Sequence, residues 1–453
     1  MTSPSSKMPD VQLMQRAVRN LSELISFETV AHPERDRQDQ SQFEAQIRAL
    51  ERLYPAVHRT LQRERIDQGG VLFRWAGTQP QGRAVVLMAH LDVVPVDPDD
   101  EWKYPAFSGI QAEGYVWGRG ALDDKGSVVA ILEAVESLLE QGFSPSEDIY
   151  LSLGGDEEVG GRDAASVVSR LAERGVRPWL VLDEGGAVAS EAFPRMGRGA
   201  AMIGLAEKGS MTVALKTRDA GGHSSTPTSG GATARLAAAI TRLDRRPFPV
   251  SLHPVSARML ELFAAEMKGI RKFLLGRAGL LKMPLAFILP VFGPEANAVV
   301  RTTVAVTQLS GSKAANALAA QASATVNLRI AIGSSVAQTL SRLERIIDDP
   351  TVRIEILDSA EPSAVSSSDG PQFEVLAETI REIFPDVAVV PYLAMAMTDS
   401  RYFCAISDAV YRFTPFRMSG EERAALHAAN ERISVQTLSE GISFYRSLLG
   451  KLA

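Results

Sequence analysis

Short apolar runs alternate with helical patterns through the first half of the chain. Residues 85–88, 149–153 and 179–182 are such runs, rich in Val, Ile and Leu, as is typical of strands buried on both faces of a parallel sheet. Residues 127–141 lie between two of them and are apolar almost all round, which predicts a helix packed against that sheet. The pattern predicts an α/β domain with a mostly parallel central sheet.

Each of these three runs leads into acidic residues. His90 and Asp92 follow the first run, residues 156–158 (Asp-Glu-Glu) the second and residues 183–184 (Asp-Glu) the third, while residues 123–124 (Asp-Asp) precede the predicted helix. The carboxyl ends of parallel strands meet at one edge of an open α/β sheet, where ligands bind. Consecutive acids repel one another unless a cation lies among them. Because imidazole and carboxylate together suit zinc, we expect a metal site at this edge.

The pattern changes after about residue 206. Residues 211–216 alternate between apolar and polar, as a half-exposed antiparallel strand does. Further strands are predicted at residues 302–309, 324–330 and 352–357, and helices at residues 232–243 and 335–347. Two strand-helix-strand units of this kind predict a separate α+β domain over residues 207–362. It is inserted into a first domain made of residues 1–206 and 363–453, which regains apolar strands at residues 387–390 and 409–412.

Composition narrows the possible partners. The 453 residues carry a net charge of −6, which favours neither nucleic acid nor an anionic membrane as a partner. The single cysteine, Cys404, is compatible with a reducing compartment. Residues 1–15 contain no apolar core of signal-peptide length, and the apolar stretch 278–292 is interrupted by Lys282 and two prolines and is too short to span a membrane. We expect a cytoplasmic protein without a membrane span.

Six motifs, in this order along the chain, resemble those of the M20 metallopeptidases, the family of zinc aminoacylases and carboxypeptidases. They are His90-Leu91-Asp92, residues 118–126 (Gly-Arg-Gly-Ala-Leu-Asp-Asp-Lys-Gly), Asp156-Glu157-Glu158, Asp183-Glu184-Gly185, Gly222-His223-Ser224 and residues 427–431 (His-Ala-Ala-Asn-Glu). Three further features resemble the carboxypeptidase S and N-acyl amino acid hydrolase branch of the family. They are residues 183–186 (Asp-Glu-Gly-Gly), residues 397–401 (Met-Thr-Asp-Ser-Arg) and the length of the chain. The resemblance implies a zinc-peptidase-like catalytic domain and an inserted lid or dimerisation domain, through which two copies form a homodimer.

The resemblance also implies two zinc ions per subunit, for which Mn²⁺ or Co²⁺ can substitute. Their ligands would be His90, Asp123, Glu158, one acid of the pair Asp183 and Glu184, and His427. Asp123 would bridge the two ions, since a shared ligand must offer two oxygens. The sequence leaves the choice between Asp183 and Glu184 open, because a shift of one residue at the strand exit exchanges them.

Five more residues receive roles from the resemblance. Asp92 would accept the second ring N–H of His90 and fix its tautomer. Glu157 would be the general base toward a metal-activated water. His223, acting in its own or the partner subunit, would stabilise the oxyanion. Asn316 and Arg329 would contact substrate, with the fork of Arg329 suited to a free carboxylate, although a strand-end arginine can equally pair with a surface acid.

Two other parts of the chain have less specific readings. Residues 399–401 and 430–431 are expected to shape the rim of the site. Residues 259–292 are longer and more apolar than the family minimum. This segment would either line an acyl pocket or form an apolar helix pair at a subunit interface.

The predicted function is hydrolysis of an amide bond next to a free carboxylate. Its substrate would be a dipeptide, a peptide C-terminus or an N-acyl amino acid. One alternative is a metal-containing binding or assembly protein without catalysis, but such a protein would have lost the base or a ligand, and neither is lost here. A two-metal phosphoester hydrolase is a second alternative, but it would carry Lys or Arg around the metal motifs, where this chain has mainly acids.

Overall fold

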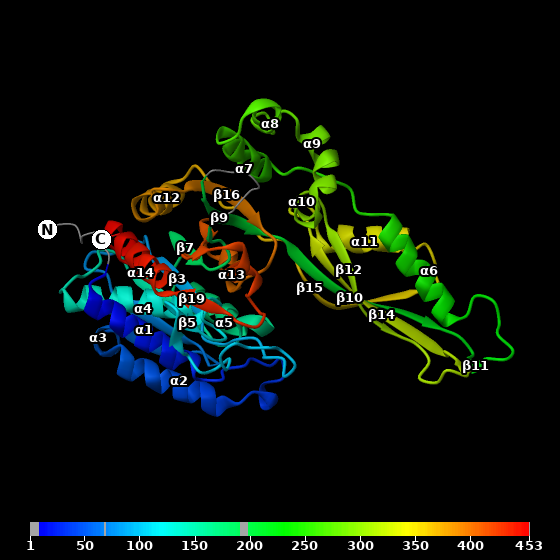
Figure 1. Cartoon of the computed structure of the whole chain (residues 1–453), viewed down its shortest axis with the longest axis horizontal. Coiled ribbons are helices and arrows are strands. Elements are labelled where there is room, and N and C mark those ends of the chain that lie inside the picture. Colours follow the sequence, from blue (N-terminus) through cyan, green and yellow to red (C-terminus); the bar gives the residue numbers. More distant parts are fainter. Residues whose placement is uncertain (1–8, 68, 191–197, 453) are drawn as a thin grey trace. The chain divides into compact units, whose positions relative to one another are not determined.

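The computed structural model describes residues 9–67, 69–190 and 198–452, and the chain divides into two compact units (Figure 1). Unit 1 consists of Met1–Leu205, Val365–Tyr392 and Thr398–Ala453, and unit 2 of Ala206–Ala364 and Leu393–Met397. The two main boundaries lie within two residues of those expected from the sequence. The short return of residues 393–397 to unit 2 was not expected.

Unit 1 is built on a sheet whose central strands are parallel, as predicted. In the described residues the strand order is β1-β2-β6-β3-β7-β17-β9-β8-β18, with β16 paired to β9. The four central strands, β6, β3, β7 and β17, run parallel to one another, and β1 and β2 continue the sheet antiparallel on one side. The strand bounds are β1 (Gln62–Arg65), β2 (Val71–Trp75), β3 (Val85–His90), β6 (Ile149–Gly154), β7 (Leu180–Asp183), β8 (Val188–Ala189), β9 (Ala200–Glu207), β16 (Ala388–Ala394), β17 (Val410–Arg412) and β18 (Arg417–Met418).

Helices cover this sheet and bury its apolar strands. Helix α4 (Lys125–Glu140) begins two residues before the predicted start, is buried along nearly its whole length and packs on β3 and against helices α1 and α14. A separate apolar core joins helix α5 to strand residues such as Val86 and Val181. The remaining elements of unit 1 are α1 (Val11–Ile25), η1 (Arg35–Arg37), α2 (Gln40–Leu53), α3 (Pro55–Thr60), β4 (Gln111–Ala112), β5 (Tyr115–Trp117), η2 (Glu157–Val159), α5 (Arg162–Glu173), α12 (Pro371–Ile383), η4 (Asp399–Ala405), α13 (Gly420–Ala424), β19 (Arg432–Ser434) and α14 (Val435–Lys451).

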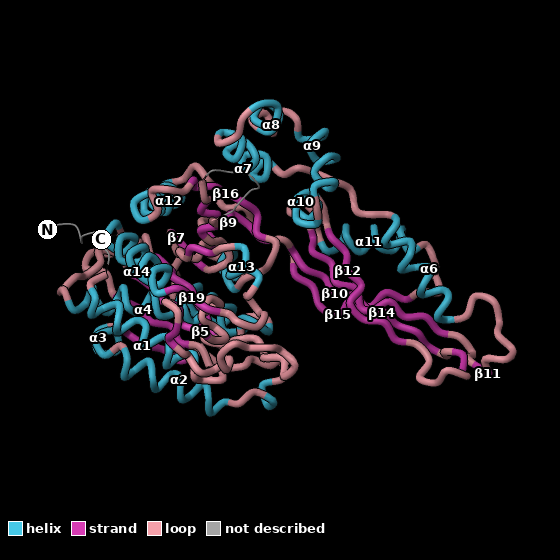
Figure 2. Tube along the Cα trace, viewed as in Figure 1, coloured by secondary structure: helices cyan, strands magenta, loops and turns pink. Residues whose placement is uncertain are grey.

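Unit 2 combines an antiparallel sheet with helices, which agrees with the α+β pattern of its sequence (Figure 2). Its four strands have the order β12-β14-β10-β15, and α6 and α11 share one apolar core with them. Strand β14 buries every second residue, as a strand with one covered face does. The bounds are β10 (Gly209–Arg218), α6 (Ala232–Arg245), β12 (Thr303–Ser310), β14 (Gln321–Ile330), α11 (Val336–Ile347) and β15 (Arg353–Ala360).

Two smaller features complete unit 2. A two-stranded sheet pairs β11 (Gly222–His223) with β13 (Ala317–Leu318). Between α6 and β12 the chain forms a run of short helices, namely α7 (Pro254–Ala265), α8 (Gly269–Leu275), α9 (Lys282–Ile288), η3 (Leu289–Phe292) and α10 (Pro294–Val300). Across the described parts of both units, no helix has the length and apolar character needed to cross a bilayer.

Glu133 of α4 makes stability depend on pH. Its buried carboxylate accepts hydrogen bonds from Asn20 and Arg16, yet burial raises its pKa to about 7. Between the usual glutamate value of about 4.5 and this pKa, the folded state therefore binds more protons than the unfolded chain. The free energy of unfolding should fall as the pH rises through this window, by about 3 kcal/mol at most.

The variant Glu133→Gln removes this titration and should flatten the profile between roughly pH 5 and pH 8. Urea unfolding across this range measures the difference between variant and wild type. Glu140→Gln is the matched control, because Glu140 also pairs with Arg16 but is exposed. The prediction would be contradicted if the free energy of unfolding fell equally steeply with pH in Glu133→Gln and in the wild type.

Candidate metal centre

The carboxyl ends of parallel strands carry the first group of predicted site residues. His90 is the last residue of β3 and pairs with Gly154, the last residue of β6. The chain leaves β6 through the short helix η2, which begins at Glu157, and Glu184 follows directly on β7. Because β3 is parallel to both β6 and β7, an imidazole and the carboxylates of two loops meet at one edge of the sheet.

Asp123 connects two histidines that are far apart in the sequence. Its Oδ1 lies 2.9 Å from Nε2 of His90, and its Oδ2 lies 2.9 Å from Nε2 of His427. His427, between α13 and β19, has a φ of 60°, in the left-handed region that residues other than glycine rarely adopt and that is enriched at functional sites. One carboxylate thus offers an oxygen to each imidazole, as a ligand shared by two metal ions must.

Two more carboxylates complete this cluster. Oε1 of Glu158 lies 3.3 Å from Nε2 of His427, and Oε1 of Glu184 lies 3.7 Å from Nε2 of His90. Within the described residues, the buried Oε1 of Glu158 makes no well-oriented hydrogen bond beyond this contact with His427, which suits a metal ligand because buried acceptors are otherwise nearly always satisfied.

Among the residues that the structure describes, two sets of three have ligand atoms that all lie within 4.8 Å of one another. They are His90 with Asp123 and Glu158, and His90 with Glu157 and Glu184. Imidazole nitrogen and carboxylate oxygen are donors that zinc accepts, so the residues present fit the ion that the motifs imply. Glu157, the predicted base, lies in the same cluster as the predicted ligands.

The cluster contains more acid than its two imidazoles can neutralise. Burial, assisted by neighbouring carboxylates, raises the pKa of Glu157 and of Glu184 well above their usual values. Burial also acts to raise the pKa of Asp123, but the hydrogen bonds with His427 and His90 outweigh it and lower that pKa. The hydrogen bond with Asp123 raises the pKa of His427 to about 10. Divalent cations would relieve the crowding of these carboxylates.

Asp92 contacts both the first histidine and the acidic loop. Nδ1 of His90 donates to the main-chain oxygen of Asp92 at 3.0 Å, while the Asp92 carboxylate lies 3.4 Å from the same nitrogen. A proton on Nδ1 leaves the Nε2 lone pair available to a metal. The carboxylate accepts the main-chain N–H groups of Glu157 and Glu158 at 3.2 and 3.0 Å. Asp92 therefore also holds the loop that carries the predicted base, a contact that the sequence did not indicate.

The structure separates the two acids that the sequence could not distinguish. Glu184 lies in the cluster, near His90. Asp183 is buried, and its Oδ2 accepts the main-chain N–H of Ser400 at 2.8 Å. The geometry therefore favours Glu184 as the ligand from this strand exit, and Asp183 as a residue that ties β7 to η4.

Glu431 was expected at the rim, but the structure buries it completely. Its carboxylate accepts a hydrogen bond from the buried guanidinium of Arg119 at 2.7 Å. It also accepts the main-chain N–H groups of Gly120, Leu122 and Asp123 at 3.1, 2.8 and 3.1 Å. Glu431 thus fixes the backbone of the loop that presents Asp123.

Residues 399–401 depart from the rim expectation in the same way. Asp399 and Ser400 are buried, and burial raises the pKa of Asp399 well above its usual value. Arg401 donates to the main-chain oxygen of Gly160 at 2.9 Å and so holds the end of the acidic loop. Asp399 and Ser400 are therefore interior residues and not part of the rim, whereas Arg401 is half-exposed.

The other predicted residues belong to unit 2. His223 is exposed on β11, with Nδ1 2.8 Å from Oγ of Ser225. Asn316 lies beside it, because its main-chain oxygen accepts the N–H of Ser224 at 3.0 Å. Arg329 is partly buried on β14, in the four-stranded sheet. The structure brings His223 and Asn316 close together in unit 2, and the roles of all three toward a substrate remain predictions.

Known proteins resemble this chain over nearly its full length. A model described as peptidase family M20/M25/M40 matches residues 86–451. Probable carboxypeptidase S-like 2 of Dictyostelium discoideum is 33% identical over 448 residues, covering 98% of this chain and 85% of the relative. An N-fatty-acyl-amino acid synthase/hydrolase of Homo sapiens is 34% identical over 406 residues, covering 88% of this chain and 80% of the relative.

Solved structures share the fold. The M20 family metallo-carboxypeptidase Sso-CP2 from Sulfolobus solfataricus superimposes with a TM-score of 0.73, covering 96% of this chain and 99% of the other. The two sequences are 17% identical, so this likeness concerns the fold alone.

Proposed function

The chain belongs to peptidase family M20/M25/M40, and from this premise we propose that it is a two-zinc hydrolase of amide bonds that adjoin a free carboxylate. The observation that carries the proposal is the geometry of the Asp123 carboxylate. Its Oδ1 lies 2.9 Å from the imidazole of His90, and its Oδ2 lies 2.9 Å from the imidazole of His427. Glu157 lies in the same cluster, as a general base must.

The membership implies a divalent metal, and the donor set supports zinc. We assign one ion to His90, Glu184 and Asp123, and the other to His427, Glu158 and Asp123, following the close contacts among these side chains. When bound, zinc supplies Lewis acidity that polarises a carbonyl group and makes water more acidic. Mn²⁺ and Co²⁺ would be accepted in its place, since they take similar ligands.

The chain's own groups would move the protons. In the proposed reaction Glu157 takes a proton from the attacking water and returns it to the nitrogen of the leaving amine. The hydrogen bond from its main-chain N–H to Asp92 holds it in place. His223 would donate a hydrogen bond to the oxyanion of the tetrahedral intermediate.

The names of the relatives support the substrate class. Removal of a C-terminal residue and hydrolysis of an N-acyl amino acid both cleave an amide next to a free carboxylate, and the two relatives are named for these activities. We assign recognition of that carboxylate to Arg329, whose fork can bind it with two hydrogen bonds, with Asn316 as a second contact. In this proposal unit 2 is the lid and dimerisation domain, which sedimentation of the full chain would test.

A substrate screen tests the function. The zinc-loaded full chain is incubated with mixed dipeptides, longer peptides and N-acyl amino acids, and products are identified by mass spectrometry. Each substrate has a matched form with an amidated carboxyl group. We expect hydrolysis of the free acids and little or none of the amides. Equal cleavage of both forms, or cleavage of phosphoesters alone, would overturn the proposal.

The choice between the two neighbouring acids predicts a difference in metal content. Glu184→Gln removes a charged ligand oxygen and should lower zinc affinity by more than the roughly 10- to 100-fold that is typical when a residue supporting a ligand is lost. Asp183→Asn retains an oxygen for the Ser400 N–H and should keep nearly the wild-type zinc content. Metal analysis after dialysis against a weak chelator measures both. The reverse order of affinities would assign the ligand to Asp183.

A further inference from the structure

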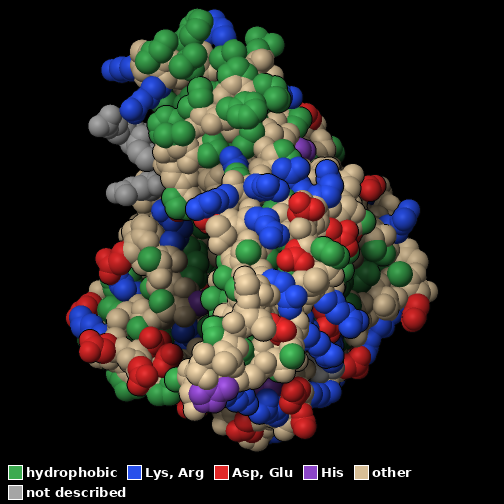
Figure 3. Space-filling model, turned by 90° about the vertical axis from the view of Figure 1, so that its right-hand side faces the viewer, with side chains coloured by type: hydrophobic (Ala, Val, Ile, Leu, Met, Phe, Trp, Pro, Cys, Tyr) green, Lys and Arg blue, Asp and Glu red, His purple; other side chains and the backbone are tan. Residues whose placement is uncertain are grey.

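Unit 2 carries an unusual surface on the segment from residue 267 to 293, here called the α8–α9 segment. It contains nine of the fifteen large hydrophobic side chains that are exposed in the described residues. The most exposed of them, between 61% and 84%, are Ile270, Leu280, Met283, Phe287, Val291 and Phe292. Figure 3 shows hydrophobic side chains gathered at the top of the view, with Lys and Arg side chains beside them. Exposed apolar area of this density marks an interaction surface.

The segment is folded and two-faced. Its inner side chains, among them Ala278, Leu285 and Ala286, are buried, and α8 packs on α7 while α9 and α10 pack on η3. The exposed residues are therefore the outer face of ordered helices, and they remain uncovered within unit 2.

The positive charge of the α8–α9 segment indicates the kind of partner that it binds. Five cations, Lys268, Arg271, Lys272, Arg277 and Lys282, lie in the segment, which contains no Asp or Glu. The chain as a whole has a net charge of −6. In the described residues none of the five forms an ion pair with an acid. A surface with local charge +5 on an acidic protein matches a strongly anionic partner.

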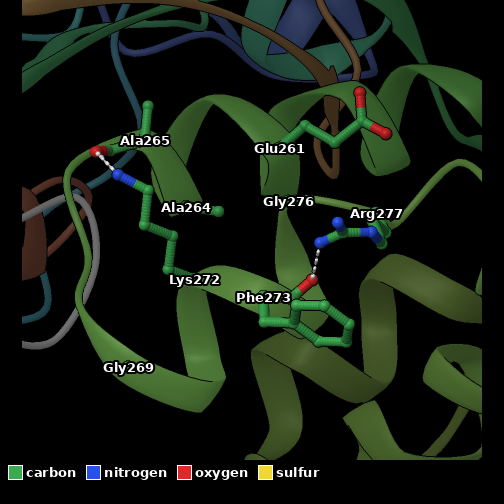
Figure 4. A pocket seen from close by; sticks show the side chains of 8 residues that line it. All are labelled: Glu261, Ala264, Ala265, Gly269, Lys272, Phe273, Gly276 and Arg277. Carbon is green, nitrogen blue, oxygen red and sulfur yellow. Dashed lines mark hydrogen bonds between the residues drawn. The ribbon is translucent and has the colours of Figure 1, made fainter.

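A small hollow brings cation and apolar group together at this surface (Figure 4). It has a volume of about 420 Å³, and its lining includes Lys272, Phe273 and Arg277 together with one acid, Glu261 of α7. The guanidinium of Arg277 lies 4.1 Å from the centre of the Phe273 ring. Side chains with an apolar body and a charged tip are typical of segments that lie in a membrane interface.

We propose that the α8–α9 segment docks this protein on the surface of an anionic lipid bilayer, with its exposed apolar side chains in the headgroup region and its cations against lipid phosphates. A second copy of the chain fits less well. An isologous contact would place the five cations of one copy against those of the other, with Glu261 of α7 the one acid that lines the hollow beside them. The segment lies on the bilayer and does not cross it, in agreement with the short helices.

Vesicle sedimentation of the full chain tests this surface. The probes are phosphatidylcholine vesicles and vesicles in which roughly one-third of the lipid is phosphatidylglycerol. We expect the wild type to bind the anionic vesicles at least about tenfold more tightly than the neutral ones, and to be released by high salt.

Two variants of the segment separate its apolar and charged parts. Phe287→Ser with Val291→Ser, and Arg271→Glu with Lys272→Glu, should each weaken binding to anionic vesicles by about tenfold or more. The matched controls are Leu309→Ser with Leu357→Ser, and Lys313→Glu with Arg353→Glu, which change exposed residues of unit 2 outside the segment. These controls should bind as the wild type does.

Three results would overturn the proposal. They are failure of the wild type to bind anionic vesicles, binding that both segment variants retain, and an equal loss in the controls. Sedimentation without lipid adds a fourth. If the wild type self-associates without lipid and the double variant Phe287→Ser with Val291→Ser does not, the surface binds a second copy of the chain instead. Circular dichroism of each variant verifies that it is folded. The readout is independent of hydrolysis, so it stands whether or not the proposed function holds.

Discussion

Glu157→Gln should lower turnover of a cleavable N-acyl amino acid or dipeptide by about a thousandfold or more, while the protein keeps its zinc. The amide has nearly the shape of the carboxylate but cannot accept the proton of water. The side chain lies beside the predicted ligands but is not one of the four carboxylate and imidazole groups that contact one another most closely. Loss of the base should therefore affect the rate far more than metal binding.

The measurement pairs steady-state kinetics with metal analysis of the same preparation. Glu173→Gln is a suitable control, because Glu173 is exposed at the end of α5. A normal rate in Glu157→Gln would remove Glu157 as the base. A low rate together with loss of zinc would indicate that Glu157 is a metal ligand instead. This outcome is worth testing because Glu157 forms one of the two sets of possible ligands, with His90 and Glu184.

The sequence predicted the site edge well because strand ends are local features. Three apolar runs followed by acids became β3, β6 and β7, with bounds close to those expected. Parallel pairing of β3 with both neighbours then brings their carboxyl ends together without further information. The prediction of a cluster around His90 required only side-chain alternation and this topological rule.

The choice between Asp183 and Glu184 could not be read from the sequence. Both follow the same apolar run, and a rotation of one residue exchanges their faces. The structure favours Glu184 because it lies near His90, whereas Oδ2 of Asp183 accepts the main-chain N–H of Ser400, 217 residues away. Only the packing of η4 against β7 supplies this information, and no local pattern encodes it.

The rim assignment was wrong for Asp399, Ser400 and Glu431, which are buried, whereas Arg401 and Asn430 are half-exposed. Glu431 and Asp399 were expected at the surface because acidic residues are usually exposed, but both are buried in the structure. One signal was present, since Arg119 stands between two glycines in an apolar stretch, and a buried arginine needs an acid. The position of that acid, 312 residues later, depends on the fold.

Net charge also concealed a local property. The value of −6 argued against an anionic membrane as partner, yet residues 267–293 alone carry five cations and no acid. The sequence reading of residues 259–292, an acyl pocket or an apolar helix pair at a subunit interface, rested on their apolar character and not on their charge. Which face of each short helix is covered follows from packing on α7 and η3, which the sequence pattern of such short helices does not specify.

Glu431→Gln should destabilise unit 1 and weaken metal binding together. Removing the charge leaves the guanidinium of Arg119, 1% exposed, without its partner, and breaking a buried pair from one side costs about 3–5 kcal/mol. Burial raises the pKa of Glu431 although Arg119 acts to lower it, so part of the cost of the ionised pair is already present in the wild type. We expect about 3 kcal/mol, the lower end of that range, in urea unfolding of the zinc-free protein.

A double variant separates stability from positioning. Arg119→Met with Glu431→Leu removes both charges and should recover the part of the lost stability that came from the unpaired guanidinium of Arg119. The N–H groups of Gly120, Leu122 and Asp123 still lose their common acceptor. Asp123 would then be held less firmly, and zinc affinity should remain about 10- to 100-fold below wild type. Wild-type zinc affinity in the stable double variant would show that Glu431 only balances Arg119 and does not position the bridging carboxylate.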